Sequence, residues 1–143
     1  NRIGVDNPLL KKSKMQWSME QEDMIKLSQL LVHSKICINS GSTLCIEALS
    51  CNIPVIVTAF DGDENLEYWK SARRLLDFPH LKKLKDLGGY LVVYSFENLF
   101  KEISNFISNP NKEIEKRNTA LFKETSANTG IATSTVVRYF LQD

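Results

Sequence analysis

The sequence predicts an α/β fold with a mainly parallel, Rossmann-like sheet flanked by helices. Short, continuously apolar runs rich in β-branched residues alternate with longer stretches whose apolar residues recur three and four positions apart. The first pattern is typical of strands buried on both faces, and the second of amphipathic helices. Strands that alternate with helices favour a parallel sheet with right-handed crossovers. The expected strands are residues 36–38, 55–57 and 90–94, and the last is expected inside the sheet because it is apolar throughout.

The clearest βαβ unit spans residues 36–60. A polar turn over residues 39–43 follows the first strand, and residues 44–51 then carry a helical pattern. Asn52 suits the residue after the helix, because Asn tolerates the left-handed conformation, and Pro54 prevents the helix from continuing. We expect both strands of this unit to be buried on two faces.

Further helices are expected on either side of this unit. A capping box at Ser18 and Gln21 predicts a helix that ends near His33, which we interpret as a capping residue. Its expected buried stripe consists of Met24, Ile25, Leu27, Leu30 and Leu31. Later helices are expected over 66–77, 81–87 (ended by Gly88-Gly89), 96–109 (capped by Ser95), 112–125 and 131–141. Ile107 and Phe122 are among the residues expected to pack inward.

Length and composition predict one domain over residues 1–143. The formal net charge of +1 gives no reason to expect a nucleic-acid partner, and no apolar run approaches the length of a membrane span. Cys37, Cys45 and Cys51 lack metal-ligand spacing, so we expect no metal site and interpret them as core residues of a reduced, cytoplasmic protein. The chain begins abruptly at Asn1, so we expect it to be the C-terminal part of a longer, two-domain protein.

The turn after the first strand has residues suited to binding phosphate. Gly41 allows close approach of a ligand to the backbone, and the hydroxyls of Ser42 and Thr43 can donate to phosphate oxygens beside the start of a helix. Glu47 follows Thr43 by four residues and so lies on the same helix face, where it could accept hydrogen bonds from a ribose diol. The alternative is an ordinary βαβ unit in which a Ser caps the helix and Glu47 is solvated.

A polar loop follows the second strand of the unit. Ligands of open parallel sheets bind outside the carboxyl ends of the strands, so this loop should flank the Gly41 turn. Asp61 is placed to accept hydrogen bonds from a sugar or a base. In the alternative interpretation, the acidic residues of this loop start the next helix.

The central unit resembles the donor-binding segment of GT-B glycosyltransferases. The resemblance rests on residues 40–49, SGSTLCIEAL, and residues 52–56, NIPVI, with Asn52 in place of the usual glycine. It is similar to the lipid II N-acetylglucosaminyltransferase and to bacterial surface-polysaccharide and CDP-glycerol-type transferases. The resemblance implies that the segment beginning at Ser40 binds a nucleotide diphosphate sugar, with Gly41, Ser42 and Thr43 on the diphosphate and Glu47 on the ribose.

This resemblance also implies an activity. The chain would be the donor-binding half of a transferase of cell-surface polysaccharide synthesis that needs no metal and no cofactor besides its sugar-nucleotide substrate. Its partners would be an acceptor glycan or lipid-linked saccharide and an N-terminal acceptor domain. That domain would normally supply the catalytic base. In this chain His80 is a candidate for proton transfer or phosphate binding, and the alternative is an exposed loop histidine. The work would be cytoplasmic, at most peripheral to the inner membrane face.

Two other functions are compatible with the fold. A UDP-sugar 2-epimerase-like enzyme would share the superfamily, although such enzymes carry further acidic and histidine residues at the helix start. A non-catalytic α/β nucleotide-binding or response-regulator-like module is the second alternative. Regulators place an aspartate at the end of a strand, whereas Asn39 ends the first strand here.

Overall fold

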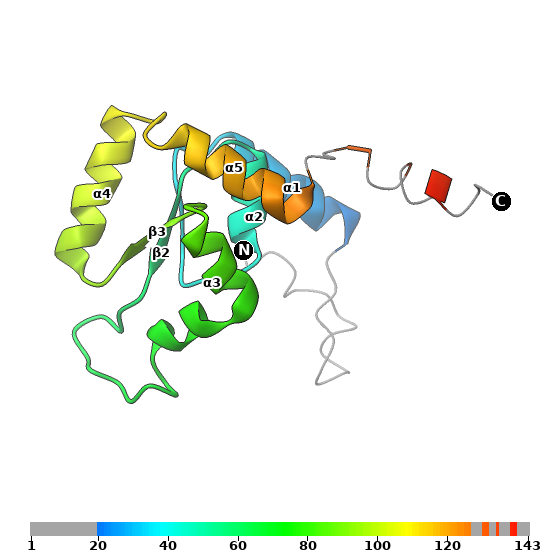
Figure 1. Cartoon of the computed structure of the whole chain (residues 1–143). Helices are drawn as coiled ribbons and strands as arrows, with labels where there is room; N and C mark the ends of the chain where they lie inside the picture. The colour runs from blue at the N-terminus through cyan, green and yellow to red at the C-terminus, as the bar shows by residue number, and fades with distance from the viewer. Residues whose placement is uncertain (1–19, 127–129, 132–133, 135–137, 140–143) are drawn as a thin grey trace. The chain divides into compact units, whose positions relative to one another are not determined.

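The computed structural model describes residues 20–126, 130–131, 134 and 138–139, which belong to two compact units, residues 1–34 and 35–143. The first unit contains α1 (Gln21–Val32). The second contains, in order, β1 (Cys37–Asn39), α2 (Leu44–Ser50), β2 (Val55–Thr58), the 3₁₀ helix η1 (Ala72–Asp77), α3 (Pro79–Asp86), β3 (Leu91–Val93), α4 (Phe96–Ser108) and α5 (Ile114–Thr125) (Figure 1). The predicted α/β architecture is confirmed. The proposed start at Ser18 and most of the expected helix 131–141 lie outside the described residues.

The three strands form one parallel sheet in the order β1-β2-β3. Ile38 pairs with Ile56 of β2, and Ile56 pairs in turn with Leu91 of β3. The central strand is therefore β2. The prediction that residues 90–94 lie inside the sheet is wrong for the described part of the chain, where β3 pairs with β2 alone. Tyr90, just before β3, is buried, and its hydroxyl donates to the Leu81 carbonyl at 2.8 Å.

Helices cover the two faces of the sheet. On one face Phe106 of α4 packs against Ile56 and Val93, while α2 packs against β1 and β2 on the other (Figure 1). The prediction that both strands of the central unit are buried on both faces is correct for β2 and wrong for β1, where Ile38 is 46% exposed. Ile38 lies on the α4 side of the sheet, but α4 packs on β2 and β3.

Two helices end with the same backbone motif. Asn52 has φ of 59° after α2, and the N–H groups of Asn52 and Ile53 bond to the carbonyls of Leu49 and Ala48. These are the two hydrogen bonds of a Schellman motif, so the predicted stop at Asn52 is confirmed. Gly88-Gly89 end α3 in the same way, as the sequence predicted.

The first helix differs from its prediction at one end. It begins at Gln21, and Glu20 and Asp23 form the capping box expected at Ser18 and Gln21. His33 is the C-cap residue, as predicted, with Nδ1 2.8 Å from the Gln29 carbonyl oxygen.

Several predicted inward-facing residues are exposed. In α1, Leu31 is buried but Met24, Ile25 and Leu30 are about half exposed. The same holds for Ile107 of α4 and Phe122 of α5. Ile107 follows the buried Phe106, and one residue turns a helix by about 100°, which directs Ile107 away from the sheet.

The predicted helix over residues 66–77 is reduced to η1. Residues 65–67 are neither helix nor strand, and residues 68–70 form a turn. Ser71 caps η1, because its hydroxyl oxygen accepts the Arg73 N–H at 3.2 Å. Such local polar contacts compete with helical hydrogen bonds, and here they delay the start of the helix.

The buried Arg117 joins α5 to the end of α4. Its guanidinium donates to the Lys112 carbonyl and, at 3.0 Å, to the Pro110 carbonyl, and its Cζ lies 6.0 Å from the centre of the Phe106 ring. Burial lowers the pKa of Arg117 from its ordinary value. The sequence predicts a helix over residues 112–125 but not the burial of Arg117, which is only 4% exposed.

We expect Arg117→Ala to lower the free energy of unfolding by about 2–3 kcal/mol, because it leaves two carbonyls without their donor and removes packing on Phe106. Urea denaturation followed by circular dichroism measures the change. Lys123→Ala, at an exposed position of the same helix, is the matched control and should stay within about 0.5 kcal/mol of the unmodified protein. Equal effects of the two substitutions would contradict the structural role of Arg117.

Candidate functional site

The carboxyl ends of all three strands meet at one edge of the sheet, because the strands are parallel. Residues 40–43 follow β1 at this edge, residues 59–71 follow β2, and Tyr94 follows β3. The Thr58 hydroxyl of β2 donates to the Asn39 carbonyl of β1 at 3.4 Å. This hydrogen bond links the last residues of the two strands, where the first two loops begin. This is the edge at which open α/β sheets bind ligands.

Asn39 organises the turn after β1, a role that our sequence analysis missed. Its side-chain oxygen accepts the Gly41 N–H at 2.7 Å and lies 3.5 Å from the Cys45 sulfur, which donates to it. An Asn that bonds the backbone two residues later forms an Asx turn. The spacing Asn39 to Gly41 was the available signal. The turn is therefore fixed by the fold itself.

Gly41 is required by its surroundings within the chain. Its φ is 102°, and a Cβ atom at this position would lie 3.2 Å from Leu81 Cδ1 and 3.4 Å from Leu75 Cβ. From the sequence, this glycine was predicted to allow close approach of a ligand. The contacts show that η1 and α3 pack closely on it, which supplies a second reason for glycine.

Hydroxyl groups surround this turn on its exposed side. Ser40, Ser42 and Thr43 are all exposed. The Ser42 oxygen accepts the Leu44 N–H at 3.3 Å, and Thr43 is the N-cap residue of α2 without a side-chain hydrogen bond to the helix. Their hydrogens remain available to donate, which is the chemistry expected of a phosphate site.

Glu47 lies in the first turn of α2 and is exposed. Its carboxylate makes neither a hydrogen bond nor an ion pair with any residue that the structure describes. The structure thus brings Glu47 onto the same short helix that follows Ser40–Thr43. Solvent can reach both the Glu47 carboxylate and the hydroxyls of Ser40, Ser42 and Thr43.

The cysteines beside the turn are buried thiols. Burial raises the pKa of both Cys37 and Cys45, which keeps them protonated at neutral pH. A protonated, buried thiol is a poor nucleophile. The arrangement therefore favours the predicted core role of these two residues over a catalytic one.

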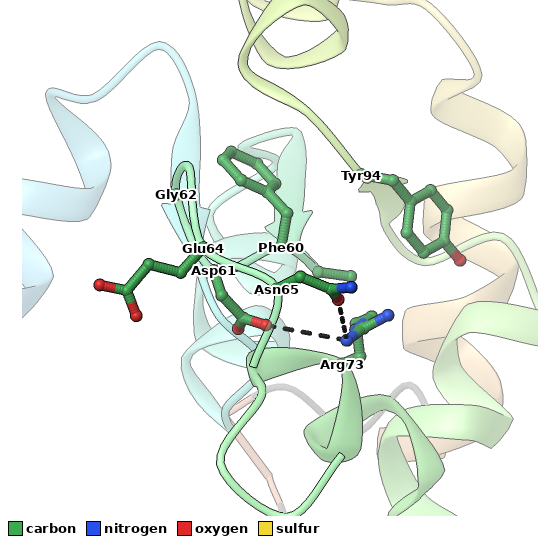
Figure 2. Close-up of a pocket in the computed structure, with 8 residues that line it drawn as sticks. Phe60, Asp61, Gly62, Glu64, Asn65, Arg73 and Tyr94 are labelled. Carbon is green, nitrogen blue, oxygen red and sulfur yellow. Dashed lines mark hydrogen bonds and ion pairs between the residues drawn. The ribbon is translucent and has the colours of Figure 1, made fainter. Parts of the chain in front are cut away.

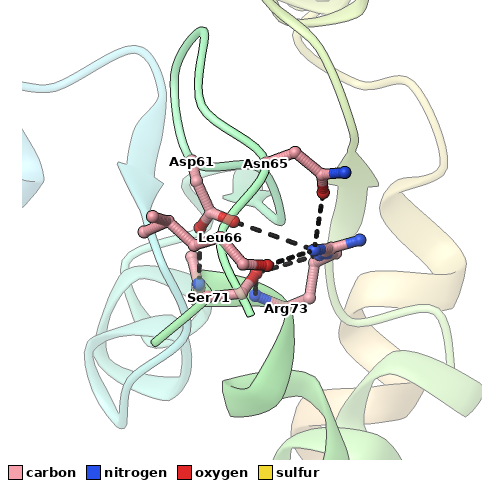
Figure 3. Close-up of polar contacts among 6 residues, drawn as sticks. Asp61, Asn65, Leu66, Ser71 and Arg73 are labelled. Carbon is pink, nitrogen blue, oxygen red and sulfur yellow. Dashed lines mark hydrogen bonds and ion pairs between the residues drawn. The ribbon is translucent and has the colours of Figure 1, made fainter. Parts of the chain in front are cut away.

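Asp61, the predicted ligand-binding residue after β2, is engaged within its own loop (Figure 3). Its carboxylate accepts the Ala72 N–H at 2.7 Å and lies 4.0 Å from Arg73 Nη2, and its side chain is 6% exposed. The hydrogen bond from Ser71, followed by that from Ala72, holds the pKa of Asp61 below its ordinary value. Asp61 therefore stays ionised and closes the loop between β2 and η1.

A pocket of about 320 Å³ opens beside this loop, at the ends of β2 and β3 (Figure 2). Its lining includes Phe60, Asp61, Asn65, Arg73 and Tyr94. Of these residues, only Asp61 was predicted from the sequence. Arg73 falls within the helix expected over residues 66–77, so its position in the pocket could not be anticipated from spacing.

His80 lies apart from this pocket lining. It is the second residue of α3, is exposed, and its ring stacks on Phe78 with centroids 6.1 Å apart. Its neighbour Leu81 packs at Gly41, so the chain passes close to the turn at this point. The structure does not bring His80 together with Asp61 or Arg73 as a catalytic group.

Within the described part of the chain, no three His, Cys, Asp or Glu side chains are grouped so that they could hold a metal ion. No helix among the same residues is long and apolar enough to cross a membrane. Comparisons of the chain with protein-family models, curated proteins and solved structures found no match.

We expect Gly41→Ala to lower the free energy of unfolding by about 2–3 kcal/mol, because it adds a close contact with Leu81 to the strain of a positive φ. Gly62→Ala is the matched control. Gly62 also has a positive φ, of 72°, but a Cβ atom there meets nothing within 4 Å, so a loss of only about 1 kcal/mol is expected. Denaturation curves for both variants decide whether packing against η1 and α3 adds to the strain.

The Asp61 contacts predict a specific dependence on pH. Because the folded-state pKa lies below the ordinary value, the contribution of Asp61 to stability is complete above about pH 4 and is lost as the pH falls through the folded pKa. Asp61→Asn should therefore make the decline of unfolding free energy below pH 4 shallower. Asp63→Asn, at an exposed position of the same loop, should leave the acid branch of the curve unchanged. Parallel acid branches for Asp61→Asn and the unmodified protein would contradict the role of Asp61.

Proposed function

We propose that this chain is the donor-binding domain of a glycosyltransferase that uses a nucleotide diphosphate sugar in bacterial cell-surface polysaccharide synthesis. The observation that carries the proposal is the turn after β1, where three exposed hydroxyls lead into the helix that presents Glu47. The resemblance of residues 40–56 to GT-B donor segments supports it from the sequence.

The hydroxyls and the carboxylate suit different parts of one ligand. Ser40, Ser42 and Thr43 can donate to phosphate oxygens at the carboxyl edge of the sheet. The Glu47 carboxylate, one turn along α2, can accept two hydrogen bonds from the ribose of the same nucleotide. The pocket after β2 lies at the same edge, where the sugar would extend from the diphosphate.

In the proposed reaction, an acceptor hydroxyl attacks the anomeric carbon of the donor sugar. The bond from that carbon to the phosphate oxygen breaks, and the nucleoside diphosphate leaves with the bonding electrons. Donors that contact the phosphates stabilise the negative charge which develops on them. We assign the base that takes the acceptor proton to a separate acceptor domain, and we place the reaction at the cytoplasmic side of the membrane.

Isothermal titration calorimetry with UDP, CDP and GDP, in the absence of metal, tests this proposal. We expect one diphosphate to bind selectively, and Glu47→Ala to weaken that binding by about 1.5–3 kcal/mol through loss of hydrogen bonds to a charged group. Glu97→Ala, at an exposed position of α4, is the matched control and should bind normally.

Each contrary result removes a defined part of the proposal. Binding that is the same in Glu47→Ala and the unmodified protein would show that this carboxylate does not hold the ribose. Absence of binding by all three diphosphates, in a protein that unfolds cooperatively, would count against a donor site in this chain.

A further inference from the structure

We propose that the pocket after β2 binds a carboxylate, and that the donor sugar is therefore a uronic acid rather than a neutral hexose. This inference rests on the proposed function for the identity of the ligand, whereas the chemistry of the pocket stands on its own contacts. The residues that carry it are Arg73, Asn65 and Tyr94, none of which was predicted as a site residue.

The Arg73 side chain is held in position by the loop around it (Figure 3). Its Nε donates to the Ser71 hydroxyl at 2.9 Å, and its Nη2 donates to the Leu66 carbonyl at 3.1 Å and to the Asn65 side-chain oxygen at 3.4 Å. A guanidinium fixed in this way loses little freedom when it binds a ligand. Its side chain is nevertheless 45% exposed.

Three donors line this pocket without a hydrogen-bond partner among the residues that the structure describes. They are Arg73 Nη1, the Asn65 amide nitrogen and the Tyr94 hydroxyl. The orientation of the Asn65 amide follows from its contact with Arg73. A guanidinium can only donate, so the amide oxygen is the atom that faces it and the amide nitrogen is left for another partner. Figure 2 shows the nitrogen and the free end of Arg73 directed to the same side, where the Tyr94 ring lies.

The acidic residues of the lining do not cancel this donor surface. The Asp61 side chain is nearly buried, and its carboxylate accepts the Ala72 N–H, so it is hardly accessible to a ligand. The Glu64 carboxylate points away from Asn65 and Arg73 (Figure 2). The accessible polar groups are therefore mainly donors.

A donor-rich site containing a fixed Arg matches a carboxylate better than a neutral hydroxymethyl group. A carboxylate only accepts hydrogen bonds and can receive two from one guanidinium, whereas a hydroxyl also needs an acceptor for its own proton. The pocket volume of about 320 Å³ is within the range that holds a small ligand such as one sugar ring. The pocket opens at the same carboxyl edge of the sheet as the turn after β1, which suits the sugar of a nucleotide held at that turn.

The test compares pairs of sugar nucleotides that differ only at C6, namely UDP-glucose with UDP-glucuronic acid and GDP-mannose with GDP-mannuronic acid. Calorimetry on the whole chain should show the uronic acid of one pair binding about tenfold more tightly than the hexose. Arg73→Gln and Asn65→Asp should both abolish this preference. Asn65→Asp places a like charge at an exposed position, so it tests the pocket even if Arg73→Gln unfolds the loop.

Lys82→Gln changes an exposed lysine outside the pocket lining. It is the control and should keep the preference for the uronic acid.

Free glucuronate and glucose are tested in parallel by saturation-transfer NMR. Nucleotide binding that depends on Glu47 but shows no preference for the uronic acid would overturn this inference and leave the proposed function intact. Binding of free glucuronate that Asn65→Asp abolishes, without any nucleotide binding, would support the carboxylate pocket and refute the donor-site proposal. Binding of neither glucuronate nor a sugar nucleotide would overturn both.

Discussion

The burial of β2 is the constraint on which the second unit depends. Val55, Ile56 and Val57 are at most 1% exposed, because helices cover both faces of this strand and another strand pairs with each edge. A strand with a parallel neighbour on each edge needs one crossover before it and one after it in the chain. Here α2 connects β1 to β2, and the segment from η1 to α3 connects β2 to β3. The loops that follow β1, β2 and β3 must then open at one edge, so the chemistry at that edge is a consequence of burying β2.

The sequence was most informative where a local signal determines the structure. Asn52 ends α2, Gly88 and Gly89 end α3, and Ser95 begins α4 by accepting the Asn98 N–H at 3.2 Å. In each case one residue type satisfies a backbone requirement that does not depend on distant parts of the chain. The exposed hydroxyls after β1 and the exposed Glu47 were predictable for the same reason, since their positions follow from the local strand-turn-helix pattern.

Most of the failures have a different origin, because they depend on contacts between distant residues. The exposure of Ile38 depends on how far α4 extends across the sheet, and no periodicity within β1 encodes that. The helix expected over residues 66–77 is shortened by the local Ser71 cap and also by a contact across the loop, since the Asp61 carboxylate, 11 residues before Ala72, accepts the Ala72 N–H. Arg73 lies within that expected helix, and its place in the pocket depends on the fold of the loop between β2 and η1. Asn39 was missed although its signal was local.

The two loops at the carboxyl edge differ in what holds them, and this bears on how the site could acquire specificity. The turn after β1 is fixed by Asn39 and by packing of Leu75 and Leu81 on Gly41, so a change in it disturbs the core. The pocket-forming part of the loop after β2 is held by hydrogen bonds, and Asn65 at its surface contacts the core little. Substitution at Asn65 can therefore change what the pocket accepts without unfolding the sheet. On the proposed function, nucleotide binding would be the constrained property of this chain and the choice of sugar the adjustable one.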